Sequence, residues 1–171
     1  RRVLFRSHCL PELIVCATIV LNLLVRIVKL ERWIDAFVIT LVGSIAALMA
    51  ASPWSLGEEV HRTELFSGML VYDGFSVLMR SLLLIFVVLF AVFTKLTGVP
   101  DREDSGDIYT LVLGSTLGMM LMCSANHLLM VFMAVEMASV PSYALAGLLK
   151  GRRQSSEAAL KYSIYGAGTA G

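Results

Sequence analysis

The sequence predicts an all-α fold, a polytopic transmembrane helical bundle of about six helices with the sixth cut short, and three observations lead to this prediction. First, 57% of the 171 residues are hydrophobic and only 16% are charged, whereas a soluble domain has about 45–50% apolar and about 25% charged residues. Second, the apolar residues fall in long runs separated by short charged patches. Third, these runs approach the length of about 20 residues that a helix needs to cross a bilayer core.

Five apolar runs are long enough to cross a membrane, and they lie at residues 11–28, 33–52, 74–94, 107–124 and 128–149. A sixth run begins near Ser155 and continues to the chain end without a C-cap or a charged flank. We therefore expect the sixth helix to be truncated and the chain to be the N-terminal part of a larger protein.

Proline and acidic residues mark the starts of these helices. Pro11 fits a first helical turn, where its missing N–H is not needed. Glu12 beside it, and Asp35 in the first turn of the second helix, complement the positive end of the helix dipole. Asp73 and Asp107 stand where the third and fourth runs begin, and we predict that each of them caps its helix.

The connections predict how neighbouring helices are joined. Residues 125–127, Ala-Asn-His, are so few that the fourth and fifth helices must form a tight antiparallel hairpin. Residues 53–73 and 94–107 are polar surface loops. Within the first of these loops, "RTELFSGMLVYD" could hold a short strand or hairpin, because Met-Leu-Val-Tyr is apolar and β-prone.

Basic residues gather in the odd-numbered connections, and this predicts the orientation of the chain. They are Arg26, Lys29, Arg32, Lys95, Arg102, Lys150, Arg152 and Arg153. Short loops that are rich in Lys and Arg remain on the cytoplasmic side. We therefore expect a multi-pass membrane protein, with residues 29–32, 95–106 and 150–154 on the cytoplasmic side or its equivalent and the native N-terminus on the opposite side.

Residues 1–7, "RRVLFRS", have no amphipathic pattern and read as the translation of a common sequencing-adapter oligonucleotide. We expect them to be non-native and exclude them from the fold. The alternative is the basic start of a signal peptide, but no small-residue cleavage site follows. Without their three arginines the chain has 11 basic and 13 acidic residues, a net charge of −2, so a nucleic acid is not an expected partner.

No motif of a soluble enzyme is present. "GAGTAG" at 166–171 lacks the preceding strand of a phosphate loop, and its small residues are better suited to close helix packing. Cys9, Cys16 and Cys123 form no Cys-x-x-Cys pair and fit the role of small apolar residues. A haem between helices would need histidines inside the spans, which the sequence does not offer.

Glu136 is the most informative residue, because it lies near the middle of the fifth apolar run. A charge at the centre of a transmembrane helix costs about 2.5–3.5 kcal/mol and usually marks an ion path or an essential partner. Ser139 and Tyr143 fall on the same face of the helix. Pro141 removes a backbone donor and so frees the carbonyl group of Met137. The alternative is a neutral structural Glu136 that is hydrogen-bonded to a neighbouring helix.

Two basic residues also lie inside predicted spans. Arg80 is about two turns into the third helix, and we expect its long side chain to extend to the nearby membrane surface. Lys161 is about two turns into the sixth helix, too deep to be dismissed as a residue of the membrane surface.

The segment from Ser124 to the chain end resembles the antiporter-like membrane subunits of respiratory complex I, and within them chain N of the bacterial NADH–quinone oxidoreductase, the counterpart of mitochondrial subunit 2. The shared pattern is Ser-Ala-Asn at 124–126, the mid-helix Glu136, Ser-x-x-x-Tyr-Ala-Leu at 139–145, Arg-Arg at 152–153 and "SSEAALKY" at 155–162. "LPELIVCATIVLNLL" and "GMLVYDGFSVLMRSLLL" resemble further parts of the family. Pro141 departs from many N chains and is closer to the paralogous chain M.

The resemblance implies a function and a division of the chain. Residues 8–106 would form N-terminal helices one to three, and residues 107–171 would begin the proton-translocating domain. Glu136 and Lys161 would carry protons, while other subunits would hold the NADH, flavin, iron–sulfur and quinone chemistry, so that this chain would need no cofactor. Its partners would be the other membrane subunits of the complex and the lipid bilayer. A related cation/proton antiporter subunit and a structural scaffold without an ion path remain alternatives.

Overall fold

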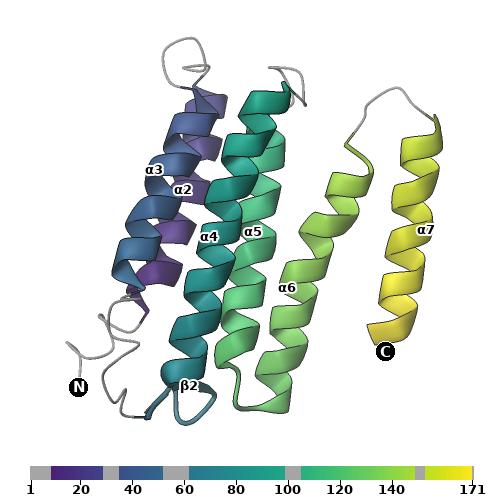
Figure 1. The fold of residues 1–171 in the computed structure, drawn as a ribbon. Helices are drawn as coiled ribbons and strands as arrows, with labels where there is room; N and C mark the ends of the chain where they lie inside the picture. The colour runs from purple at the N-terminus through teal and green to yellow at the C-terminus, as the bar shows by residue number, and fades with distance from the viewer. Residues whose placement is uncertain (1–8, 29–34, 52–61, 99–104, 149–152, 171) are drawn as a thin grey trace.

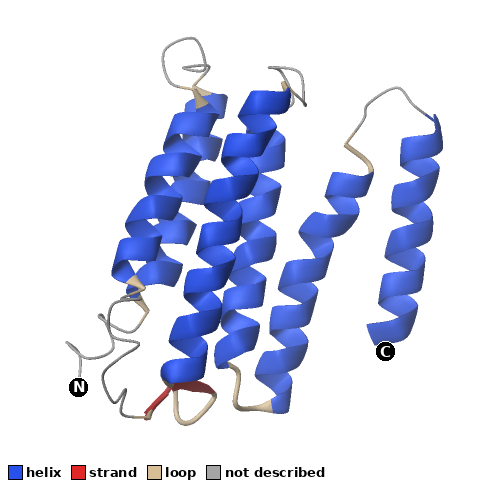
Figure 2. Cartoon of the chain, in the orientation of Figure 1, coloured by secondary structure: helices blue, strands red, loops and turns tan. Residues whose placement is uncertain are grey.

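The computed structural model describes residues 9–28, 35–51, 62–98, 105–148 and 153–170, and these form six helices and one β-hairpin (Figure 1, Figure 2). In chain order the elements are α2 (Leu10–Ile27), α3 (Ala36–Ala50), β1 (Thr63–Leu65), β2 (Leu70–Tyr72), α4 (Gly74–Thr97), α5 (Ser105–Ser124), α6 (Leu128–Ala146) and α7 (Arg153–Ala170). The predicted helical bundle and the predicted hairpin are both confirmed. Residues 1–7 lie outside the described part of the chain.

Helices α2 to α5 form a bundle, and α6 and α7 extend it on one side (Figure 1). α6 packs along α5, and α7 packs along α6. The apolar core lies inside the bundle, where its members are Val15, Ala47, Ala51, Leu84, Val87, Leu113, Leu117 and Met120. Large apolar side chains also cover the outer faces, for example Phe86, Leu89 and Phe93 on α4. Apolar surfaces both inside and outside are expected of helices that face lipid.

Four of the described helices, α2, α4, α5 and α6, are long and apolar enough to cross a membrane. α3 is apolar but has only 15 residues within the described part, shorter than the predicted run at 33–52. α7 is less apolar than these four helices, because it contains the charged residues Arg153, Glu157 and Lys161 together with several small polar residues. The chain is therefore a multi-pass membrane protein, and its predicted spans differ in length and hydropathy.

The helix starts agree with the sequence except at Asp35, which was expected in the first turn of α3 but precedes it, and at Asp107. Pro11 lies in the first turn of α2. Asp35 precedes α3 and accepts a bond from the backbone N–H of Phe37, and Asp73 accepts one from Ser76 at 2.8 Å. The prediction for Asp107 was wrong: α5 begins earlier, at Ser105, so Asp107 lies inside the first turn.

The β1–β2 hairpin is antiparallel, with Thr63 opposite Tyr72 and Leu65 opposite Leu70. Its turn includes two non-glycine residues with positive φ, and Gly68 follows with φ of 87°. This conformation favours glycine, which has no side chain to clash with the backbone.

The C-terminal ends of α2, α4 and α6 lie at the end of the bundle opposite the hairpin (Figure 1). Two ion pairs join helices there, Arg26 with Asp107 and Lys95 with Asp35. The helix ends that flank the three basic connections thus share one side, as expected. Residues 29–32, 99–104 and 150–152 of these connections lie outside the described residues.

Candidate functional site

Glu136 lies eight residues after the first residue of α6 and ten before the last, so it is close to the helix centre. At 1.5 Å per residue this places it about 12 Å from the helix start. Its side chain is half-buried. Among the described residues, no side chain forms an ion pair or hydrogen bond with the carboxylate. A carboxylate at this depth without a fixed counter-charge can respond to a charge that moves near it.

The residues expected on the same face as Glu136 have different roles. The hydroxyl of Ser139 donates to the carbonyl oxygen of Val135 at 2.7 Å, within its own helix. Tyr143 instead points to α7, where its ring meets that of Tyr162 edge to face with 4.8 Å between the ring centroids. The Tyr143 hydroxyl lies so close to Gly166 that an added Cβ would be 2.0 Å from it. The absence of a side chain at Gly166 thus permits close packing of α7 against Tyr143.

Pro141 lies inside α6, and the helix continues through it. The carbonyl oxygen of Ala138, three residues before Pro141, accepts a side-chain hydrogen bond. Ser115 of α5 donates this bond at 3.0 Å. The helical donor of this carbonyl is the N–H of Ser142, which Pro141 does not remove, so the freeing of the Met137 carbonyl by Pro141 stays a prediction. Ser142 adds a bond to the carbonyl of Ser139 at 2.6 Å.

α5 and α6 approach each other closely beside this proline. A Cβ added to Gly118 would lie 2.5 Å from the backbone nitrogen of Ala138, and one added to Gly114 would lie 3.5 Å from the ring of Pro141. Residues 114–118 form a Gly-x-x-x-Gly pattern, which brings helix backbones together in membranes. This pattern was overlooked in the sequence, although it could have identified the α5–α6 contact and Ser115 within it.

Lys161 is not brought to Glu136. Its Nζ atom forms an ion pair with Glu157 at 2.7 Å, one turn earlier on α7, and both side chains are exposed. A Glu that precedes a Lys by four residues is a favourable arrangement on a helix surface. Within the described part of the chain, the two residues proposed for proton translocation therefore lie on separate helices without direct contact.

A second polar centre, which the sequence did not reveal, lies at the hairpin end of the bundle. The expectation that Arg80 reaches the membrane surface was wrong, because its side chain is only 1% exposed and runs inward to Glu12, which is 7% exposed. The Arg80 Nε atom lies 2.8 Å from Glu12 Oε1, and Nη2 donates to the hydroxyl of Ser124 at 2.7 Å. The guanidinium carbon is 5.6 Å from the ring centroid of Tyr72.

Burial raises the pKa of the Tyr72 hydroxyl; the Arg80 charge opposes this effect and the Glu12 charge adds to it. The guanidinium group lies over the face of this ring, where the π-electrons attract a cation. A signal for this centre does exist in the sequence. Glu12 and Arg80 have opposite charges near the starts of two helices that begin at the same end of the bundle, and buried membrane charges usually pair.

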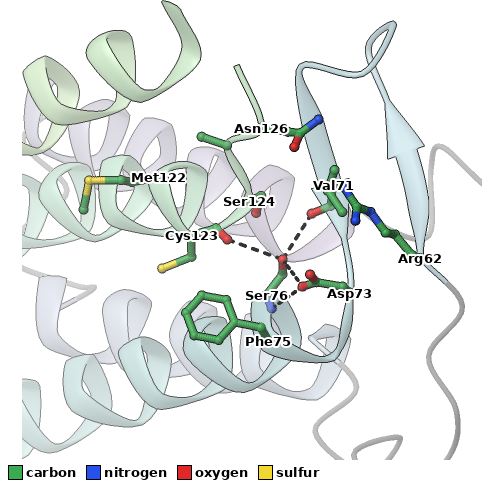
Figure 3. Close-up of a pocket in the computed structure, with 10 residues that line it drawn as sticks. Arg62, Val71, Asp73, Phe75, Ser76, Met122, Cys123, Ser124 and Asn126 are labelled. Carbon is green, nitrogen blue, oxygen red and sulfur yellow. Dashed lines mark hydrogen bonds between the residues drawn. The ribbon is translucent and has the colours of Figure 1, made fainter. Parts of the chain in front are cut away.

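A cavity of about 310 Å³ borders this second centre (Figure 3). Ser76 lines the cavity, and its hydroxyl contacts Asp73 Oδ1 at 2.8 Å and the carbonyl oxygens of Val71 and Cys123 at 3.1 and 3.4 Å. Ser124 lines the cavity and also accepts the bond from Arg80. The hairpin, the start of α4 and the end of α5 are therefore joined by one polar network.

Comparison with known proteins places this geometry in a family. Residues 125–169 match the family model described as NADH:quinone oxidoreductase/Mrp antiporter, TM, and this range contains both Glu136 and Lys161. The NADH-quinone oxidoreductase subunit N 2 of Sorangium cellulosum is 35% identical over 166 residues, which are 94% of this chain and 33% of the relative. Subunit N 2 of Chloroherpeton thalassium is 40% identical over 111 residues, 63% of this chain and 22% of the relative.

A solved structure is similar over the same extent. The respiratory complex I from Thermus thermophilus with bound aureothin contains a chain that matches with a TM-score of 0.70 and 30% identity, over 94% of this chain and 34% of that one. The present chain thus spans about a third of the length of relatives that match nearly all of it. The chain belongs to the family of antiporter-like membrane subunits of respiratory complex I and is similar within that family to subunit N.

Proposed function

We propose that this chain takes part in proton translocation, coupled to electron transfer from NADH to quinone, and that Glu136 is its proton-carrying residue. The observation that carries the proposal is the position of Glu136 at the centre of α6, half-buried and without a counter-charge among the described residues. It lies inside the segment that matches the family model.

The physical mechanism is a change of protonation state. An apolar environment favours the neutral carboxylic acid, whereas a nearby cation favours the carboxylate. A carboxyl group between these influences takes up or releases a proton when the partner charge moves. Lys161 is our proposed partner: its ion pair with Glu157 is exposed, and such pairs contribute only about 0.3–0.5 kcal/mol. Its side chain can therefore leave Glu157 at little cost.

The proposal includes the setting of the chain. The helices lie in a bacterial inner membrane, with the basic connections on the cytoplasmic side. Other membrane subunits of complex I are the partners, and the centres that react with NADH, flavin, iron–sulfur clusters and quinone belong to other subunits. In this arrangement the chain uses the energy of their reactions and needs no cofactor of its own.

Glu136→Gln tests the proposal in the subunit as it occurs in its membrane complex. The substitution keeps the shape and the hydrogen bonding of the side chain but removes its titratable charge. Proton pumping coupled to NADH oxidation should drop sharply with assembly largely intact, and Glu136→Asp should retain part of it. Glu64→Gln, at an exposed carboxylate on β1, is the matched control and should pump normally. A wild-type proton-to-electron ratio in Glu136→Gln would show that Glu136 has only a structural role. That result would favour the alternative of a structural scaffold without an ion path.

A related cation/proton antiporter subunit is the second candidate, because the matching family model also includes Mrp antiporters. Exchange of Na⁺ for protons in sealed vesicles without NADH, abolished by Glu136→Gln, would favour this alternative. Proton uptake that depends on NADH and not on Na⁺ would favour the complex I function.

A further inference from the structure

The turn between α5 and α6 is bound directly by the β1–β2 hairpin. The backbone N–H of Asn126 donates to the carbonyl oxygen of Met69 at 2.8 Å. The side-chain amide of Asn126 donates to the carbonyl oxygen of Gly68 at 2.9 Å. Ala125 also forms an antiparallel bridge with Leu70. The hairpin thus fixes the turn from its outer side.

Arg80 holds the same turn from inside the bundle. Its Nη2 atom donates to the hydroxyl of Ser124, the last residue of α5, and this bond is buried. Glu12 fixes the other side of the guanidinium group at 2.8 Å. Three helices, α2, α4 and α5, therefore meet at the Arg80 side chain, which binds the residue directly before the turn.

Stability alone does not account for this ion pair. Removal of two charges from water costs several kcal/mol for each ion, and the loss is recovered only when the remaining hydrogen-bonding groups are satisfied. Both carboxylate oxygens of Glu12 are buried, and neither accepts a well-aligned hydrogen bond from the described residues. Buried ionic groups of this kind can instead specify one arrangement of the surrounding helices.

We propose that Glu12 and Arg80 are positioning residues for Glu136, because together with the hairpin they fix the α5–α6 turn and with it the depth and rotation of α6. This inference rests on the proposed function of Glu136. α6 begins at Leu128, immediately after the turn, and its rigid backbone carries any displacement of the turn to Glu136.

Contacts on either side of Glu136 hold α6 in position. The first is the turn at 124–127, and the second is the close approach of Gly118 to Ala138, two residues beyond Glu136. The close contacts at Ala138 and Pro141 both lie on the C-terminal side of Glu136. The turn fixes α6 on the N-terminal side, so that Glu136 lies between two restrained parts of the helix.

Two variants and one control test the proposal in the subunit within its membrane complex. Ser124→Ala removes the acceptor of Arg80 but keeps the ion pair, and Glu12→Gln removes the charge that holds Arg80. Arg26→Gln is the control, because it breaks an ion pair at the opposite end of the bundle. The readouts are hydrogen–deuterium exchange of the peptide that contains Asn126 and the proton-to-electron ratio. Both variants should exchange about tenfold faster and should pump fewer protons per electron, whereas the control should change neither readout.

The outcomes separate this inference from the proposed function. Wild-type exchange in Ser124→Ala and Glu12→Gln would overturn the inference, and so would faster exchange with an unchanged ratio, because the turn would then not position Glu136. If Glu136→Gln fails to pump while both variants behave as wild type, only the positioning role is wrong. If Glu136→Gln pumps normally, the proposed function fails and the inference fails with it. Ser124→Ala decides the matter should Glu12→Gln not assemble.

Discussion

Replacement of Gly118 by alanine tests the close approach of α5 and α6 beside Glu136. The new Cβ would lie 2.5 Å from the backbone nitrogen of Ala138 and 2.8 Å from its Cα, whereas ordinary contact begins at 3.4 Å. The obstacle is backbone and cannot rotate away, so the two helices must separate by about 0.9 Å. The hydrogen bond from Ser115 to Ala138, now 3.0 Å, would lengthen with them.

The magnitude follows from three contributions. Overpacking costs about 1–3 kcal/mol, and loss of the Ser115 hydrogen bond costs about 1 kcal/mol. The better helix propensity of alanine returns about 1 kcal/mol. We therefore expect Gly118→Ala to lower the free energy of unfolding by about 1–3 kcal/mol. Gly114→Ala is the matched control, because its Cβ would make an ordinary contact of 3.5 Å with Pro141 and should not destabilise the protein.

The assay is denaturation of the purified membrane subunit in mixed micelles by sodium dodecyl sulfate, followed by far-ultraviolet circular dichroism. Equal free energies of unfolding for Gly118→Ala and Gly114→Ala would refute the reasoning, since both substitutions carry the same gain in helix propensity. Such a result would mean that α5 and α6 are farther apart at Ala138 than the structure shows.

Two further substitutions probe other contacts. Gly166→Ala should weaken the contact of α7 with Tyr143 by about 1 kcal/mol, less than Gly118→Ala because the obstacle is the tip of a side chain. The same denaturation assay should show no loss of unfolding free energy for Gly168→Ala, where an added Cβ meets nothing within 4 Å. Equal losses in the two variants would contradict this prediction. Asp73→Ala removes a cap that accepts two bonds from Ser76 and should cost about 1 kcal/mol; thermal unfolding at the wild-type midpoint would show that the cap is not needed.

The sequence was sufficient for the parts of the fold that depend on local pattern. The apolar runs indicated the helices, because a helix that crosses a bilayer needs about 20 predominantly apolar residues in succession. Met-Leu-Val-Tyr indicated the hairpin, and the position of Asp73 before a long apolar run indicated a cap. These features depend on residues close together in the chain, so they can be recognised without knowledge of the packing.

The polar contacts were predicted less well, because they depend on which helices become neighbours. The long side chain of Arg80 can reach either the membrane surface or the bundle interior, and only the position of Glu12 on α2 decides between them. Lys161 found a partner one turn away, and this local pair competes with a distant carboxylate. Ser115 could have been recognised from the Gly-x-x-x-Gly pattern around it, but its partner, the carbonyl oxygen of Ala138, depends on how α5 packs against α6.

A turn of three residues between α5 and α6 also governs how this part of the chain is inserted during synthesis. Three residues extend at most about 10 Å, much less than the bilayer core of about 30 Å. The turn is therefore too short to keep α6 outside the membrane, away from α5, after α5 has been inserted. The two helices are expected to enter the membrane as one unit. Glu136 then enters the bilayer together with α5, whose residues Gly114 and Gly118 fit against the backbone and Pro141 ring of α6. One face of α6 is thus covered by protein before the helix contacts lipid.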